Sequence, residues 1–240
     1  HNPFCSSRKH LRTVLDDDPQ LKPTMPGSVK KILPVLALCL LGAGQHPAHA
    51  FPADLFGYVQ EPQQRLADFP QWLRVIERHL ADDLQDGDCS ARLINRCHLA
   101  EWRRFIDQTR ALPVPEQLKA VNRYANGKDY VLDLDNYGVE DYWAIPREFL
   151  NNGGDCEDYA ITKFFSLRWL GLPTEDLRLV IVQDTNLRVP HAVLAVARGA
   201  EVFILDNQVQ AVLSHRDVVH YAPVFSINES RWWIHVPRAL

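Results

Sequence analysis

The chain has 240 residues, of which 46% are hydrophobic and 23% charged, and its formal net charge is −4 at pH 7. A mildly acidic chain without a block of basic residues lacks the positive surface that nucleic-acid binding requires, so no nucleic-acid partner is expected. Residues 51–240 are numerous enough to form one domain with its own hydrophobic core.

The N-terminal quarter has the features of an export signal. Met25 is the only methionine, two lysines precede an apolar run over residues 32–44, and Ala48-His49-Ala50 provides an A-x-A cleavage site. The apolar run is shorter than the ~20 residues that a transmembrane helix needs. We therefore expect a signal peptide at 25–50, preceded by a non-native or miscalled extension at 1–24 and followed by an exported domain at 51–240.

In an oxidising compartment, two cysteines of the expected domain could form a disulfide. After residue 50 the chain contains Cys89, Cys97 and Cys156. Cys89 and Cys97 are close enough in sequence to bridge a short loop, which would contribute ~2–3 kcal/mol, and both staying reduced is the alternative. Cys156 is then the cysteine left over, as expected for a reactive thiol.

Helices come before strands along the expected domain, which indicates an α+β fold with an antiparallel sheet. Apolar spacing predicts helices within 70–126, with one face formed by Trp72, Val75, Ile76, His79 and Leu80, and another by Leu99, Trp102, Phe105 and Ile106. A third helix is predicted from Pro115 to about Asn126, a loop over 129–142, a short helix from Pro146 and a helix from Cys156 to about Gly171. The predicted strands are 177–183, 191–197, 202–206 and 231–236.

Cys156 follows two glycines and lies in the first turn of its predicted helix. There, unpaired backbone N–H groups and the positive end of the helix dipole favour a thiolate over a thiol. His191 starts one strand and Asp206 ends the next, so the chain offers a nucleophile, a base and a group to orient that base.

The hairpin between those strands fixes where the base and its orienting group lie. Gly199-Ala200 suits a two-residue turn, which pairs Arg198 with Glu201 and, further along, Val193 with Asp206. His191 and Asp206 are then diagonal neighbours on one face, within reach of each other at somewhat under ~7–8 Å between Cβ atoms. Cys156, Ala160, Phe164 and Leu167 form one helix stripe, and we expect it to pack on that same face.

Three carboxylates surround the cysteine, at Asp155, Glu157 and Asp158. They suit the start of a helix, but so much negative charge opposes thiolate formation. A hard divalent cation would neutralise them, and oxygen ligands favour calcium over zinc. For the oxyanion hole, the backbone N–H of Cys156 is one expected donor, and Trp143, Asn151 and Asn152 are candidates for the second.

The motif around the cysteine resembles one known family. The segments DYWAIPREFL (141–150), GGDCEDYA (153–160), VPHAV (189–193) and LDN (205–207) are similar to those of the bacterial transglutaminase-like cysteine proteinases. The resemblance implies a papain/transglutaminase-like fold, with an N-terminal helical lobe and a central cysteine-bearing helix packed on an antiparallel sheet. It implies a catalytic triad of Cys156, His191 and Asp206.

The same resemblance implies a role. It suggests a periplasmic, calcium-dependent endopeptidase, with Asp155 and Glu157 as calcium ligands and Asp158 as a further one. The expected substrate is a large surface adhesin, cut near its N-terminus at a paired-alanine site to release a cell from a biofilm. The expected inhibitor is an inner-membrane receptor for cyclic di-GMP.

Three other functions use the same residues or the same acidic site. A transglutaminase-type acyl transferase shares the chemistry up to the acyl-enzyme and differs in its acceptor. A cell-wall amidase would use the same triad on peptidoglycan. A non-catalytic calcium-binding module that docks on a membrane receptor would not need Cys156.

Overall fold

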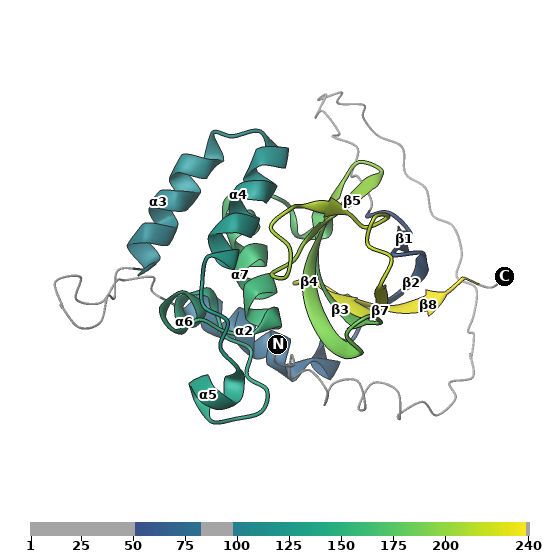
Figure 1. Ribbon diagram of the computed structural model, residues 1–240, viewed down its shortest axis with the longest axis horizontal. Coiled ribbons are helices and arrows are strands. Elements are labelled where there is room, and N and C mark those ends of the chain that lie inside the picture. The colour runs from purple at the N-terminus through teal and green to yellow at the C-terminus, as the bar shows by residue number, and fades with distance from the viewer. Residues whose placement is uncertain (1–50, 83–97, 239–240) are drawn as a thin grey trace, which may run out of the picture.

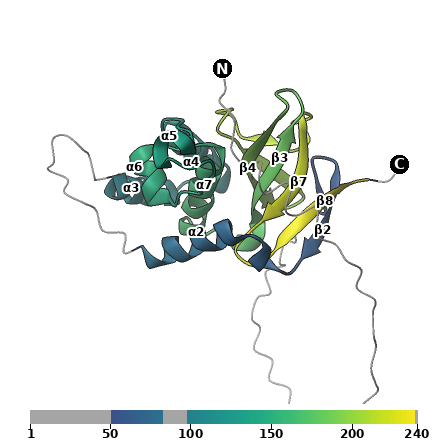
Figure 2. The ribbon, with the colours of Figure 1, turned by 90° about the horizontal axis from the view of Figure 1, so that it is seen from below.

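The structure is a computed structural model, and it describes residues 51–82 and 98–238. The helices gather on one side and a curved sheet lies on the other, as both views show (Figures 1 and 2). This arrangement confirms the predicted α+β class, with the cysteine-bearing helix α7 packed on the sheet. The predicted signal peptide, the extension before it and both Cys89 and Cys97 lie outside the described residues.

The sheet is antiparallel throughout and has the order β1-β2-β8-β7-β3-β4-β5-β6. The first and last segments of the domain therefore meet, because β2 pairs with β8. The strands of the sheet are β1 (Asp54–Leu55), β2 (Tyr58–Gln63), β3 (Leu177–Asp184), β4 (Val189–Arg198), β5 (Glu201–Leu205), β6 (Leu213–Ser214), β7 (Tyr221–Ile227) and β8 (Trp232–Pro237).

The α-helices of the described part are α2 (Pro70–Ala81), α3 (His98–Arg110), α4 (Val114–Asn126), α5 (Asp133–Tyr137), α6 (Pro146–Asn152) and α7 (Cys156–Trp169). Residues on all sides of α7 are buried, because the sheet covers one side of this helix and the helices α4 and α6 cover the other. Within the described residues, no helix is both long enough and apolar enough to span a membrane.

Two cores lie on opposite faces of the sheet. The helix-side core contains Cys156, Ala160 and Phe164 of α7 together with Ala192 and Leu194 of β4. The distal core, on the other face, takes the alternate residues of the same strands and includes Val180, Val193, Val202, Ile204 and Tyr221. Both faces of β3 and β4 are therefore apolar and buried.

The predicted helices and strands agree with the structure to within one or two residues at most ends. Several features differ. Leu80 is 78% exposed rather than part of the buried face of α2. The predicted loop at 129–142 contains the short helix α5. Strands β1, β2, β6 and β7 were not predicted, and β7 was hidden because Pro223 interrupts its pattern.

Candidate active site and acidic cluster

The turn before Cys156 requires its two glycines. Gly153 has φ +73°, and a Cβ there would lie 2.4 Å from the carbonyl oxygen of Asp129. A Cβ on Gly154 would lie 2.2 Å from Asp158 Oδ2. The segment around Asp129 is held against this turn, because Val131 N donates to Gly154 O at 3.0 Å. The glycines thus allow two chain segments to approach closely just where the helix starts.

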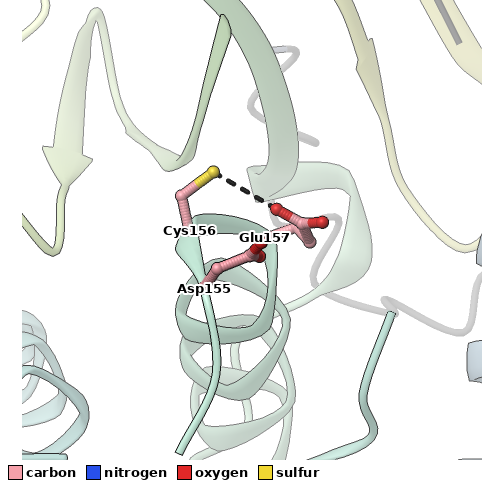
Figure 3. A group of neighbouring side chains, drawn as sticks. All are labelled: Asp155, Cys156 and Glu157. Atoms are coloured by element: carbon pink, nitrogen blue, oxygen red, sulfur yellow. Dashed lines mark hydrogen bonds between the residues drawn. The ribbon is translucent and has the colours of Figure 1, made fainter. Parts of the chain in front are cut away.

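Cys156 is the first residue of α7, as predicted, and Asp155 is its N-cap. Cys156 is 1% exposed, and its Sγ lies 3.2 Å from Glu157 Oε2. Figure 3 shows the side chains of Asp155 and Glu157 gathered beside it at the start of the helix. The helix start favours a thiolate, whereas a carboxylate this close disfavours it.

The nucleophile of a cysteine protease is the reduced thiolate, so activity should be measured with a reductant present.

His191 and Asp206 form a buried pair. The register of β4 and β5 is the predicted one, with Arg198 opposite Glu201, and His191 Nε2 lies 2.9 Å from Asp206 Oδ1. Both side chains are at most 6% exposed. Because an ionised carboxylate only accepts hydrogen bonds, Nε2 carries the proton of this pair, which leaves His191 Nδ1 able to accept another.

Asp206 is held by further donors. Tyr221 Oη donates to Oδ2 at 2.6 Å, and the backbone N–H of Gln208 donates to Oδ1 at 2.9 Å. Burial raises the pKa of Asp206, but hydrogen bonds from His191, Tyr221 and Gln208 outweigh it and bring the pKa to about 2. Burial and the charge of Asp206 together raise the pKa of Tyr221. At neutral pH Asp206 is therefore a carboxylate that accepts hydrogen bonds from three donors.

The structure corrects the predicted packing of α7. His191 pairs with Val182 and shares the distal face with Val193, whereas α7 packs on the face of Ala192 and Leu194. The stripe that starts at Cys156 therefore does not lie on the face that carries His191 and Asp206. Alternation could not distinguish these faces, because both are apolar.

One electrostatic interaction nevertheless relates the cysteine side of α7 to Asp206. Lys163 lies seven residues after Cys156, so both project from the same side of the helix. Lys163 is buried, and burial lowers its pKa to about 7 although the charge of Asp206 raises it. This side of α7 is thus directed towards the end of β5, where Asp206 follows the strand.

The acidic cluster is larger than the sequence suggested. Side chains of Asp133 and Asp141 join Asp155, Glu157 and Asp158 in groups whose oxygen atoms lie within 4.8 Å of one another. Asp133 is 1% exposed and lies in α5. Only their charge marks these two residues in the sequence, because Asp133 lies in a helix too short for a periodic pattern and Asp141 lies in the loop after it. The cluster is able to hold a metal ion.

The electrostatics of this cluster are unfavourable without a cation. Burial, followed by the charge of Asp155, raises the pKa of both Glu157 and Asp158 well above the ordinary value. Buried carboxylates crowded by like charges resist ionisation for this reason. Hard oxygen ligands at this density suit calcium better than zinc.

Asp158 has a structural role in addition. Its Oδ1 accepts the backbone N–H of Ala144 at 2.7 Å, and its Oδ2 accepts that of Asp155 at 3.2 Å. It therefore caps the start of α7 and fastens the segment before α6 to it.

The candidates for a second oxyanion donor differ in their surroundings. Trp143 is 3% exposed, and its indole N–H donates to Asp141 Oδ1 at 3.1 Å. That places it in the core beside the acidic cluster. Asn151 and Asn152 are exposed at the end of α6, so they remain candidates.

The family model for the bacterial transglutaminase-like cysteine proteinases matches residues 89–239. The chain belongs to this family. It is therefore a cysteine endopeptidase with a transglutaminase-like fold. A search among curated proteins found no match.

Solved structures of LapG from Legionella pneumophila are similar to this family member. The calcium-bound structure is 30% identical, covers 68% of this chain and 86% of LapG, and has a TM-score of 0.54. The EGTA-treated structure is also 30% identical, covers 70% of this chain and 87% of LapG, and has a TM-score of 0.55.

Proposed function

We propose that this protein is a calcium-dependent cysteine endopeptidase of the periplasm that cleaves the N-terminal region of a large surface adhesin. The observation that carries the proposal is the buried His191–Asp206 pair, together with a cysteine at the start of α7 in a chain of this family. The acidic cluster beside Cys156 supports the metal dependence.

In the proposed reaction, Cys156 Sγ attacks the carbonyl carbon of the scissile bond. His191 receives the thiol proton on Nδ1, the nitrogen that faces away from Asp206, and passes it to the leaving amine. Asp206 holds Nε2–H and stabilises the imidazolium that forms. The backbone N–H of Cys156, at the helix start, supports the oxyanion. Water then hydrolyses the acyl-enzyme and regenerates the thiol.

Calcium would be held by Asp155 and Glu157, with Asp133, Asp141 and Asp158 in the same cluster. Bound there, it would neutralise buried carboxylates and keep the start of α7 ordered. Two features support this: the raised pKa values in the cluster and the similarity to LapG, which has a calcium-bound structure.

The substrate, location and inhibitor are proposed from family membership. The candidate substrate is an adhesin cut at a paired-alanine site, and cleavage would release the cell from a biofilm. The predicted signal peptide supports a periplasmic location. An inner-membrane receptor for cyclic di-GMP is the proposed inhibitor.

The experiment is a cleavage assay on the N-terminal region of a large adhesin from the same genome, using reduced protein from residue 51 onward. Mass spectrometry of the products, with and without a primary amine, separates hydrolysis from acyl transfer. We expect a free carboxylate at the new C-terminus, and no product with Cys156→Ala. An amide with the added amine would indicate acyl transfer, and cleavage by Cys156→Ala would remove this cysteine from the mechanism.

A further inference from the structure

The two oxygens of Asp206 have different partners. Oδ1 accepts from His191 Nε2 and from the backbone N–H of Gln208, while Oδ2 accepts from Tyr221 Oη at 2.6 Å. In the described part of the chain, Tyr221 is the donor that the structure gives to Oδ2. The residue comes from β7, 15 residues after Asp206, and nothing in the reaction above uses it.

We propose that Tyr221 is a positioning residue for this reaction, whose hydroxyl holds Asp206 in the orientation that receives the Nε2–H of His191. The inference rests on the proposed function, because it assigns Tyr221 a role through the same base. Tyr221 does not itself need to touch the substrate.

The position of the Tyr221 ring is well defined by its neighbours. Tyr221 pairs with Asp184 at the start of β7 and is 5% exposed. Its ring packs edge-on against Phe56, with centroids 5.9 Å apart, and lies 5.7 Å from the ring of His191. A rigid ring with a buried hydroxyl fixes the acceptor more precisely than a solvent-exposed donor would.

Loss of the hydroxyl would leave a buried carboxylate oxygen without that donor. The carboxylate could then turn about its χ2 bond, and His191 would lose the fixed acceptor that selects its Nε2–H tautomer. Because a hydrogen bond to a charged group is a strong one, we expect the rate to fall by about ten- to a hundred-fold. The main chain of Gln208 still holds Oδ1, so the loss should be partial.

Other titratable groups face Asp206 and Tyr221 and set the expected pH behaviour. They are His191 on β4, Lys163 on α7, and Asp184 and His220 beside Tyr221. Hydrogen bonds from Tyr221 and His191 lower the pKa of Asp206. Tyr221→Phe should therefore raise the pKa of Asp206 and shift the acidic limb of the pH profile of kcat to higher pH.

The test compares Tyr221→Phe with a matched control. Tyr142→Phe also removes a phenol that donates to a carboxylate, since Tyr142 Oη lies 2.9 Å from Glu148 Oε1, but Arg78 continues to hold Glu148. We expect Tyr221→Phe to lower kcat with little change in KM, and Tyr142→Phe to leave both near wild type. Phenylalanine keeps the ring contacts of Tyr221, so the fold should survive, and a melting curve verifies that.

Two further measurements separate positioning from simple packing. In an Asp206→Asn background, Tyr221→Phe should have almost no additional effect, whereas a packing defect would add to the loss. Histidine labelled with ¹⁵N should show the Nε2–H tautomer for His191 in the wild type and a mixed population in Tyr221→Phe.

The results that would overturn this inference differ from those that would overturn the proposed function. An unchanged kcat in Tyr221→Phe, while cleavage still requires Cys156, would overturn the inference and leave the proposed function standing. If the wild type shows no Cys156-dependent cleavage, the proposed function fails. The ¹⁵N spectrum then decides for Tyr221: a changed His191 tautomer supports the positioning role and an unchanged one refutes it.

Discussion

Substituting Gly154 by alanine should destabilise the whole protein, because the added methyl group has no room. The new Cβ would lie 2.2 Å from Asp158 Oδ2 and 2.8 Å from both Cβ and Cγ of the same residue. Movement of a flexible tip cannot relieve this, since the clash includes the base of the side chain. Asp158 must therefore rotate and give up its hydrogen bonds to the backbone N–H groups of Ala144 and Asp155.

The expected loss of stability follows from those two hydrogen bonds. At ~1.5 kcal/mol each, the upper end for an ordinary buried hydrogen bond, their loss costs about 3 kcal/mol. For a domain of this size, each kcal/mol lowers Tm by roughly 2–4 °C, so we expect a fall of about 6–12 °C. The start of α7 would move with Asp158, so activity should fall as well.

Differential scanning fluorimetry of Gly154→Ala beside Gly127→Ala measures this effect. Gly127 ends α4 with φ −80°, and a Cβ there would meet backbone atoms at an ordinary 3.5 Å. Such a site tolerates alanine and often gains a little stability from it. A Tm of Gly154→Ala within a degree of that control would refute the close approach that we describe.

Two further predictions concern the charged groups. Asp206→Asn removes the anion that holds His191 and should cut kcat by about a hundred-fold or more, measured by initial cleavage rates; a rate near wild type would exclude the orienting role. Burial lowers the pKa of His79 to about 4, against the charge of Asp82. As the pH falls, His79 is therefore protonated in the unfolded chain at a higher pH than in the folded protein. The free energy of unfolding should fall by about 3 kcal/mol between pH 6.5 and 4. His79→Phe, which keeps a ring against Phe165, should lose that part of the pH dependence in urea titrations. If the free energy of unfolding depended on pH in the same way in both proteins, this role of His79 would be contradicted.

The hairpin that carries His191 and Asp206 could be predicted in detail because its information is local. Gly199 and Ala200 mark a turn, and a two-residue turn determines the register of both strands. Once Arg198 faces Glu201, the positions of His191 and Asp206 follow, and the 2.9 Å contact between their side chains confirms them.

The face on which α7 packs could not be predicted in the same way. Residues such as Ala192 and Leu194 on one face of β4 are as apolar as Val193 and Ala195 on the other. A strand buried on both faces carries no alternation that distinguishes the helix side. The choice depends on long-range packing of the whole sheet, which no local pattern records.

Tyr221 and Asp133 were missed for a similar reason. Tyr221 begins a strand whose apolar pattern is broken by Pro223, and it meets Asp206 only through the strand order β7-β3-β4-β5. Asp133 joins the acidic cluster through a five-residue helix. Both become visible only when segments distant in sequence are brought together.

The most direct test of this account is a cleavage assay with calcium and with a chelator, on the reduced wild type and on Cys156→Ala, against the N-terminal region of the adhesin. We predict cleavage by the wild type in calcium, strong loss with the chelator, recovery when calcium is restored, and none by Cys156→Ala under any condition. Cutting that persists in the chelator would contradict the metal assignment. Cutting by Cys156→Ala would contradict the central claim that this cysteine is the nucleophile.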